Sequence, residues 1–220
     1  MKFQYVFFDL DGTITESAPG IINSVRYALK KMGYPSDDIE TIRKFIGPPL
    51  KDSYMKYYGM TEEQAEHGIT CYREYYTVQG IFDNSVYDGV IETLEALKAS
   101  GKRLVIATSK PEKFAKMIAE HFAFDKYFDK ICGATMDEKR VEKADVIAYA
   151  LEELGLSEDD LSQILMVGDR KHDILGGKAN GLKTMGVLFG YGDLEELQNA
   201  GADYIVEHAS DISKVILAME

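Results

Sequence analysis

Short apolar runs and amphipathic stretches alternate along most of the chain. The runs are rich in Val, Ile and aromatic residues and end at polar or glycine positions, which is typical of buried strands. They cover Tyr5 to Phe8, Leu104 to Ala107, Lys130 to Gly133, Ile164 to Gly168, Thr184 to Leu188 and Tyr204 to Val206. The pattern therefore predicts a series of short buried strands spread over most of the sequence.

Two amphipathic stretches between these runs read as helices. Residues 90–100 and 144–154 each carry an apolar residue at every third or fourth position, and Gly155 is a natural stop for the second helix. Strands that alternate with helices are the signature of a parallel sheet covered on both faces. We therefore expect an α/β fold with a Rossmann-like parallel sheet and helices on both of its faces.

One region interrupts this alternation. Residues 16–83 contain helical patterns and no convincing strand, beginning near Pro19, which suits the first turn of a helix. Residues 61–79 predict another helix, and packing within this region is the simplest explanation of its aromatic stripe. We expect 16–83 to form a helical domain inserted after the first strand, while 1–15 and 84–220 form the core domain.

The composition contributes mainly by what it excludes. The 220 residues are 45% hydrophobic, which is enough for a sizeable buried core. The net charge of −12 repels nucleic-acid backbones and anionic membranes, so neither is expected as a partner. No apolar run approaches the roughly 20 residues that span a bilayer, and the start of the chain does not resemble a secretory signal. Cys71 and Cys132 lack metal-ligand spacing and suit a reducing compartment, so we expect a soluble, cytoplasmic protein.

Candidate chemistry begins where the first strand ends. Asp9 and Asp11 follow Phe8 at alternate positions, and Gly12 permits a sharp turn of the backbone. Open parallel sheets bind ligands at the carboxyl ends of their strands. Two neighbouring carboxylates repel unless a cation or a shared proton relieves the repulsion. The pair indicates a metal, a separation of the two pKa values, or both, although Asp11-Gly12 alone would favour an acidic turn.

Polar side chains also follow two later strands. Thr108 and Ser109 follow one strand, and Pro111 then marks the start of a helix, where amides and hydroxyls suit a phosphate. Asp169 and Asp173 follow another strand, and such oxygen ligands suit Mg²⁺. The hydroxyl signal is weak alone, because Ser and Thr routinely cap helices.

A lysine near the start of the predicted helix at 144–154 completes the set. Lys143 could reach the strand ends and neutralise a phosphate there. Its local sequence alone favours an exposed surface lysine in a charged stretch. Lys110 and Lys139 are competitors for the same role, and we prefer Lys143 because it lies just before the helix.

These four signals, in this order, resemble the haloacid dehalogenase superfamily of phosphohydrolases. The family pattern is a strand ending Asp-x-Asp-Gly-Thr, a strand ending in Thr or Ser, a lysine, and a strand ending Gly-Asp with a later Asp. The resemblance runs from residue 5 to about residue 192. Segments 46–50 and 187–192 are similar to the phosphoglycolate phosphatase-like branch, and the helical insert looks like the family's cap domain.

The resemblance implies a Mg²⁺-dependent phosphatase that works through an aspartyl phosphate. Asp9 would attack phosphorus, and Asp11 would protonate the leaving alcohol and then deprotonate water. Mg²⁺ would be held by the Asp9 carboxylate, the Asp11 backbone carbonyl and Asp169, with Asp173 in support. The residues implied for substrate binding are Gly12, Thr108, Ser109 and Lys143 at the phosphate and Arg43 in the cap.

The same resemblance leaves the substrate open among small phosphate monoesters, with phosphoglycolate and nucleoside 5′-monophosphates as the leading candidates. A sugar-phosphate mutase of the β-phosphoglucomutase kind is the alternative enzyme. A catalytically silent binding protein on the same scaffold is the alternative outside enzymes. A dehalogenase is disfavoured, because those relatives generally lack the second carboxylate that Asp11 supplies. Monomer and homodimer both remain open.

Overall fold

The chain folds into two compact units. The structure, a computed structural model, describes residues 2–137 and 139–219. One unit comprises Met1–Thr15 and Val86–Glu220, and the other comprises Glu16–Ser85. In sequence, the second unit is therefore an insertion into the first.

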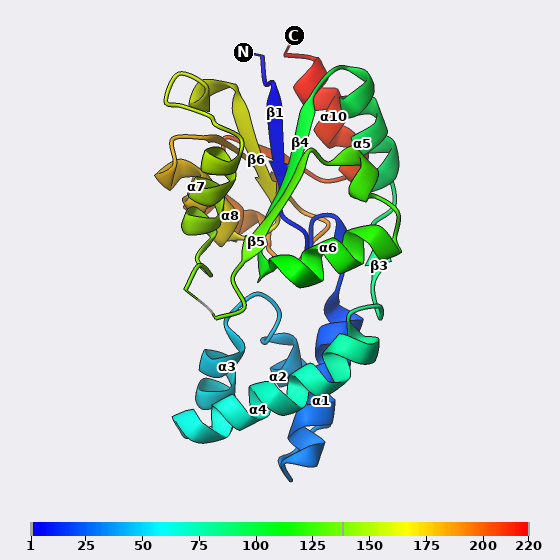
Figure 1. Cartoon of the computed structure of the whole chain (residues 1–220), viewed down its shortest axis with the longest axis vertical. Helices are drawn as coiled ribbons and strands as arrows, with labels where there is room; N and C mark the ends of the chain where they lie inside the picture. The colour runs from blue at the N-terminus through cyan, green and yellow to red at the C-terminus, as the bar shows by residue number, and fades with distance from the viewer. Residues whose placement is uncertain (1, 138, 220) are drawn as a thin grey trace. The chain divides into compact units, whose positions relative to one another are not determined.

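The larger unit is built on a sheet of six strands in the order β5-β4-β1-β6-β7-β8 (Figure 1). The strands are β1 (Tyr5–Phe8), β4 (Arg103–Pro111), β5 (Lys130–Ala134), β6 (Ile164–Gly168), β7 (Lys183–Val187) and β8 (Tyr204–Val206). Every pairing is parallel. Phe8 of the central strand β1 pairs with Ile106 of β4 and with Val167 of β6. The carboxyl ends of these three strands therefore meet at one edge of the sheet.

Helices cover both faces of this sheet, and the predicted α/β fold is confirmed. Figure 1 shows α7 and α8 on one side of the sheet and α5 and α10 on the other. The helices of this unit are α5 (Val90–Ala99), α6 (Glu112–His121), α7 (Lys143–Glu153), α8 (Lys171–Ala179), α9 (Leu194–Ala200) and α10 (Ala209–Leu217), with the 3-10 turns η2 (Asp125–Tyr127) and η3 (Leu161–Gln163). Within residues 2–137 and 139–219, no helix combines the length and the apolar character needed to cross a membrane.

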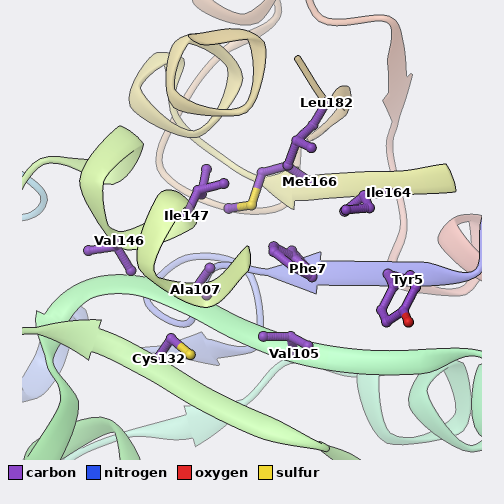
Figure 2. Packing of buried hydrophobic residues seen from close by; sticks show 11 residues of the cluster. Tyr5, Phe7, Val105, Ala107, Cys132, Val146, Ile147, Ile164, Met166 and Leu182 are labelled. Atoms are coloured by element: carbon purple, nitrogen blue, oxygen red, sulfur yellow. The ribbon is translucent and has the colours of Figure 1, made fainter. Parts of the chain in front are cut away.

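Successive residues of the strands pack against opposite helical layers. Tyr5 and Phe7 of β1 lie in a buried cluster with Ile147 of α7 (Figure 2). The intervening residues Val6 and Phe8 are buried as well, because the other face of the sheet is also covered. This double burial explains why the strands read as continuous apolar runs rather than as alternating patterns.

The smaller unit is helical. It contains α1 (Ala18–Lys31), α2 (Ile39–Arg43), α3 (Leu50–Tyr58), α4 (Glu62–Tyr75) and the π-helical turn η1 (Tyr76–Gly80). The sequence predicts one helix over 61–79, whereas the α-helix ends at Tyr75 and a π-helical turn follows. This turn sets Gly80 against α1, where a Cβ on Gly20 would lie 1.9 Å from the Gly80 carbonyl oxygen. Only glycine at position 20 permits that approach without a shift of the backbone.

The chain passes between the units at two short strands, β2 (Thr15–Glu16) and β3 (Ser85–Val86), which pair in a two-stranded sheet. The first crossing lies between Thr15 and Glu16. The second lies between Ser85 and Val86, whereas the sequence predicts it after residue 83. The prediction followed the end of the helical pattern, and the chain continues beyond that point before it reaches β3.

Both cysteines are buried and free. Burial raises the pKa of the Cys132 thiol to about 11, and it raises the pKa of Cys71 as well. Since the thiolate is the reactive form of cysteine, both side chains are poor nucleophiles near neutral pH.

Candidate active site

The carboxyl end of β1 gathers side chains from three adjacent strands. Asp9 follows the last residue of β1, Thr108 lies on β4 next to it, and Asp169 follows the last residue of β6. Thr108 is 1% exposed, Asp9 9% and Asp169 0%. Buried polar groups at a sheet edge that suits ligands are typical of a functional site.

Lys143 lies at the centre of these groups. It is the first residue of α7, and its side chain is buried. Its Nζ lies 2.7 Å from Asp9 Oδ1 and 2.8 Å from Asp173 Oδ1, and it donates a hydrogen bond of 3.1 Å to the Ala107 carbonyl. An ammonium group is stable at such depth only when it is paired in this way.

The two competing lysines lie elsewhere. Lys139 has a side chain that is 83% exposed and lies 3.0 Å from Asp137. The side chain of Lys110, on β4, is only 6% exposed, but its Nζ lies 2.7 Å from Asp11 Oδ2. The geometry therefore brings Lys143, the preferred lysine, to the Asp9 carboxylate.

Three carboxylates form a group that suits a metal ion. One oxygen each of Asp9, Asp169 and Asp173 lies within 4.8 Å of the others, and all three residues are buried. Oxygen donors of this kind are the ligands that Mg²⁺ prefers. Asp173, predicted only as a supporting residue, thus belongs to the same group as the two predicted carboxylate ligands.

Burial and mutual repulsion make this group electrostatically strained. Burial raises the pKa of Asp9 to about 6, from 3.8, although the nearby Lys143 ammonium opposes the shift. Burial and the neighbouring carboxylates of Asp173 and Asp9 hold the pKa of Asp169 well above its usual range. Burial alone would lower the pKa of Lys143, but Asp173 and Asp9 outweigh it and raise the value. One ammonium thus offsets only part of the charge of three carboxylates, and a divalent cation would relieve the remainder.

Asp11 has a different neighbour. Its Oδ2 accepts a hydrogen bond of 2.7 Å from Lys110, and its Oδ1 is buried with no hydrogen-bond partner among residues 2–137 and 139–219. The backbone of Lys110 is anchored in turn, because its N–H donates to Thr108 Oγ1 at 3.2 Å. From sequence, Lys110 was considered only as a competitor of Lys143 for the phosphate. No sequence pattern indicated its pairing with Asp11.

Asp169 is held from both sides by Thr13 and Tyr191, which lie in segments that carry the family resemblance but to which the sequence assigned no role. Its Oδ1 accepts a hydrogen bond of 3.3 Å from Thr13 Oγ1, and its Oδ2 accepts one of 2.7 Å from the Tyr191 backbone N–H. Gly12 lies against it with φ +81°, and a Cβ there would be 2.3 Å from Asp169 Oδ2. The Gly12 N–H donates to the Thr15 carbonyl, so this glycine shapes the turn that carries the site.

The two other predicted substrate residues lie in different units. Ser109 lies on β4 beside Thr108 and is half-buried. Arg43 is the last residue of α2 in the helical unit, and its side chain is exposed. The remaining predicted residues converge on the carboxyl end of β1.

This arrangement suits transfer of an anionic group. Asp9 is a carboxylate placed at a strand end, Lys143 supplies positive charge beside it, and Asp11 is a second carboxyl that can exchange a proton. A nucleophile, a cationic group and a proton carrier within one site are the requirements of acyl or phosphoryl transfer.

Comparison with known proteins points to a family with this fold. Residues 6–187 match the family described as haloacid dehalogenase-like hydrolase. A crystal structure of a predicted phosphatase from Clostridium acetobutylicum has a TM-score of 0.91 and 47% sequence identity to this chain. That similarity covers 99% of this chain and 100% of the other.

Two curated relatives are similar over most of the sequence. A protein named 5′-nucleotidase from Pseudomonas aeruginosa is 42% identical over 198 residues, which covers 90% of this chain and 88% of that protein. A protein named tyrosine-protein kinase PtkA from Mycobacterium tuberculosis is 38% identical over 212 residues, covering 96% of this chain and 71% of that protein. The similarity therefore includes both units of the structure.

Proposed function

Because this chain belongs to the haloacid dehalogenase-like hydrolases and is a phosphoric monoester hydrolase, we propose that it uses Asp9 as the nucleophile and Mg²⁺ as the cofactor. The observation that carries this proposal is the buried group of Asp9, Asp169 and Asp173 with Lys143 among them. Such a group is costly to bury without a cation, and it lies where a parallel sheet presents ligands.

The residues fit the proposed metal ion. The Asp9 and Asp169 carboxylates and the Asp11 backbone carbonyl would hold Mg²⁺, with Asp173 in support. The bound ion would supply positive charge to the transferring phosphoryl group. Thr108 and Lys143 would bind the phosphoryl oxygens from the protein side, and the Lys143 ammonium is already fixed beside the nucleophile.

The proposed reaction has two displacements at phosphorus. An oxygen of Asp9 forms a bond to phosphorus while the ester P–O bond breaks, and Asp11 gives its proton to the departing alcohol oxygen. Asp11 then takes a proton from water, whose oxygen attacks phosphorus and releases phosphate and the Asp9 carboxylate. Lys110 holds Asp11 Oδ2, and the other oxygen of this carboxyl, Oδ1, would carry the proton.

The substrate class is a small phosphate monoester, and we propose a nucleoside 5′-monophosphate or phosphoglycolate. The relative named 5′-nucleotidase, which is 42% identical, supports the nucleotide. The helical unit would act as a cap that excludes water and selects the leaving alcohol, with Arg43 as a candidate contact. Fold alone does not choose between such substrates.

Phosphate release from a panel of monoesters tests this function. The purified protein should hydrolyse para-nitrophenyl phosphate in the presence of Mg²⁺. Its rate of hydrolysis should fall at least about 100-fold when a chelator removes the metal. Within the panel, a nucleoside 5′-monophosphate or phosphoglycolate should have the highest kcat/KM. Isomerisation of a sugar phosphate with little phosphate release would instead identify a mutase.

Mg²⁺ affinity should fall steeply as the pH drops below about 6. The metal binds ionised carboxylates, and the raised pKa of Asp9, about 6 in the metal-free protein, makes protons its competitors there. For each proton that Mg²⁺ must displace from a carboxyl group, the Mg²⁺ affinity should fall about tenfold for every unit by which the pH drops. Titration calorimetry with Mg²⁺ alone at pH 5, 6, 7 and 8 measures this dependence.

The same shift has the opposite consequence for the metal-free fold. A carboxyl whose pKa is higher in the folded than in the unfolded state favours folding while it is protonated. The contribution of Asp9 to stability is therefore lost as the pH rises from about 4 to 6.

For the metal-binding prediction, an Mg²⁺ affinity that stays constant between pH 5 and 8 would contradict the placement of Asp9 in the metal site.

A further inference from the structure

The segment between β7 and α9, residues 188–193, packs its backbone against the two loops that carry the carboxylates. A Cβ on Gly190 would lie 2.2 Å from the Gly12 carbonyl oxygen, and a Cβ on Gly192 would lie 2.0 Å from the Asp169 carbonyl oxygen. Both approaches are too close for any side chain larger than hydrogen. The segment is therefore fitted to the end of β1 and to the end of β6 at once.

The first connection of this segment to the site is through Tyr191. Its backbone N–H donates the hydrogen bond of 2.7 Å to Asp169 Oδ2. A backbone donor fixes the direction of that oxygen but contributes no side chain to the site. Together with the Thr13 hydroxyl, this contact restrains one of the two carboxylates that follow β6.

The second connection comes from Glu196, in the first turn of α9. Its Oε1 accepts hydrogen bonds of 2.8 Å from the Arg170 Nε–H and from the Lys171 backbone N–H. Lys171 is the first residue of α8, so its N–H has no acceptor within that helix. Glu196 thus caps the start of α8 from a different helix, and its negative charge suits that helix end.

A hydrogen bond within residues 169–173 also holds this loop. The Arg170 backbone N–H donates to Asp173 Oδ2 at 3.0 Å, which directs Oδ1 of Asp173 toward Lys143. Glu196 holds Arg170 and Lys171, and both of these residues lie between Asp169 and Asp173 in the sequence. The three carboxylates of the site repel one another, so the loop that carries two of them needs such an external restraint.

We propose that Glu196 is a positioning residue for metal binding. Its carboxylate contacts Arg170 and the Lys171 backbone N–H, and it acts by holding residues 169–173 in the conformation that presents Asp169 and Asp173 together. This inference rests on the proposed Mg²⁺ site. Partners that orient metal ligands in this manner typically account for about 10- to 100-fold in affinity.

The test compares Glu196→Ala with Glu195→Ala, which removes a neighbouring exposed glutamate from the same helix. In titration calorimetry with Mg²⁺ alone, Glu196→Ala should raise Kd by about 10- to 100-fold, and Glu195→Ala should leave it unchanged. Glu196→Gln keeps an acceptor for the Lys171 N–H and should recover part of the affinity. At saturating Mg²⁺, kcat of Glu196→Ala should return to within about threefold of the wild type.

A second readout needs no metal. In the metal-free protein, amide hydrogen exchange of residues 169–173 should quicken in Glu196→Ala while the strands keep their protection. Unchanged Kd and unchanged exchange would overturn the proposal, as would an equal loss of protection throughout the sheet. If the wild type itself failed to bind Mg²⁺, the proposed metal site would fall, and the exchange measurement would still decide whether Glu196 holds this loop.

Discussion

Replacing Asp9 with Asn should abolish phosphate release while the protein stays folded. The amide has nearly the shape of the carboxylate but carries no charge and does not form an acyl phosphate. Loss of a nucleophile of this kind lowers kcat by about 10⁴-fold or more. Steady-state assays with para-nitrophenyl phosphate in saturating Mg²⁺ measure the effect, and circular dichroism verifies the fold.

Rapid quenching with labelled substrate examines the intermediate directly. The wild type should form an acid-stable, hydroxylamine-sensitive phosphoenzyme, and Asp9→Asn should form none. Asp37→Asn, at a side chain that is 96% exposed in the helical unit, is the matched control and should keep both activity and labelling. A rate for Asp9→Asn within tenfold of the wild type would show that another group attacks phosphorus.

Replacing Lys143 with Met should damage both stability and catalysis. Its ammonium lies 2.7 Å from Asp9 and 2.8 Å from Asp173, so its loss leaves two buried carboxylates without their cation. Removing one partner from a buried ion pair costs about 3 to 5 kcal/mol. In chelator at pH 8, guanidinium unfolding should report a loss of that size, and kcat in Mg²⁺ should fall by about 100- to 1,000-fold.

The pH dependence of this loss identifies its cause. Asp9 has a pKa of about 6 with Lys143 in place, and removal of the lysine raises that value further. At pH 5 the carboxyl is protonated and needs no cation, so the destabilisation should be smaller than at pH 8. Lys139→Met, at a side chain that is 83% exposed, should change the unfolding free energy by less than about 0.5 kcal/mol. Equal effects of the two substitutions would refute the buried ion pair.

The sequence predicts best those residues of the candidate site that directly follow a strand. Asp9 and Asp169 follow apolar runs, and a parallel sheet brings the ends of such runs together. Lys143 was harder to identify, because a lysine at a helix start is usually exposed and two other lysines were candidates. Only the packing of α7 against the sheet brings its Nζ to Asp9.

Other features depend on contacts that leave little trace in sequence. The Tyr191 contact with Asp169 is made by a backbone N–H, which any residue could supply. Glu196 is one of many acidic residues, and its role depends on where α9 lies beside α8. The end of β4 was also missed: the strand continues to Pro111, with an irregularity after Thr108, where polar side chains conceal the strand pattern.

The position of β1 has a consequence for how the protein is made. Strand β1 leaves the ribosome before the strands that it pairs with, because its neighbours β4 and β6 begin at Arg103 and Ile164. Such distant pairings form late, because closing long loops precedes any gain from contact. Asp9 is therefore synthesised long before Asp169 exists, and a nascent chain carries the proposed nucleophile without the carboxylate beside which it lies in the folded protein. Catalytic competence should appear abruptly during biosynthesis, when the second half of the sheet closes on the first.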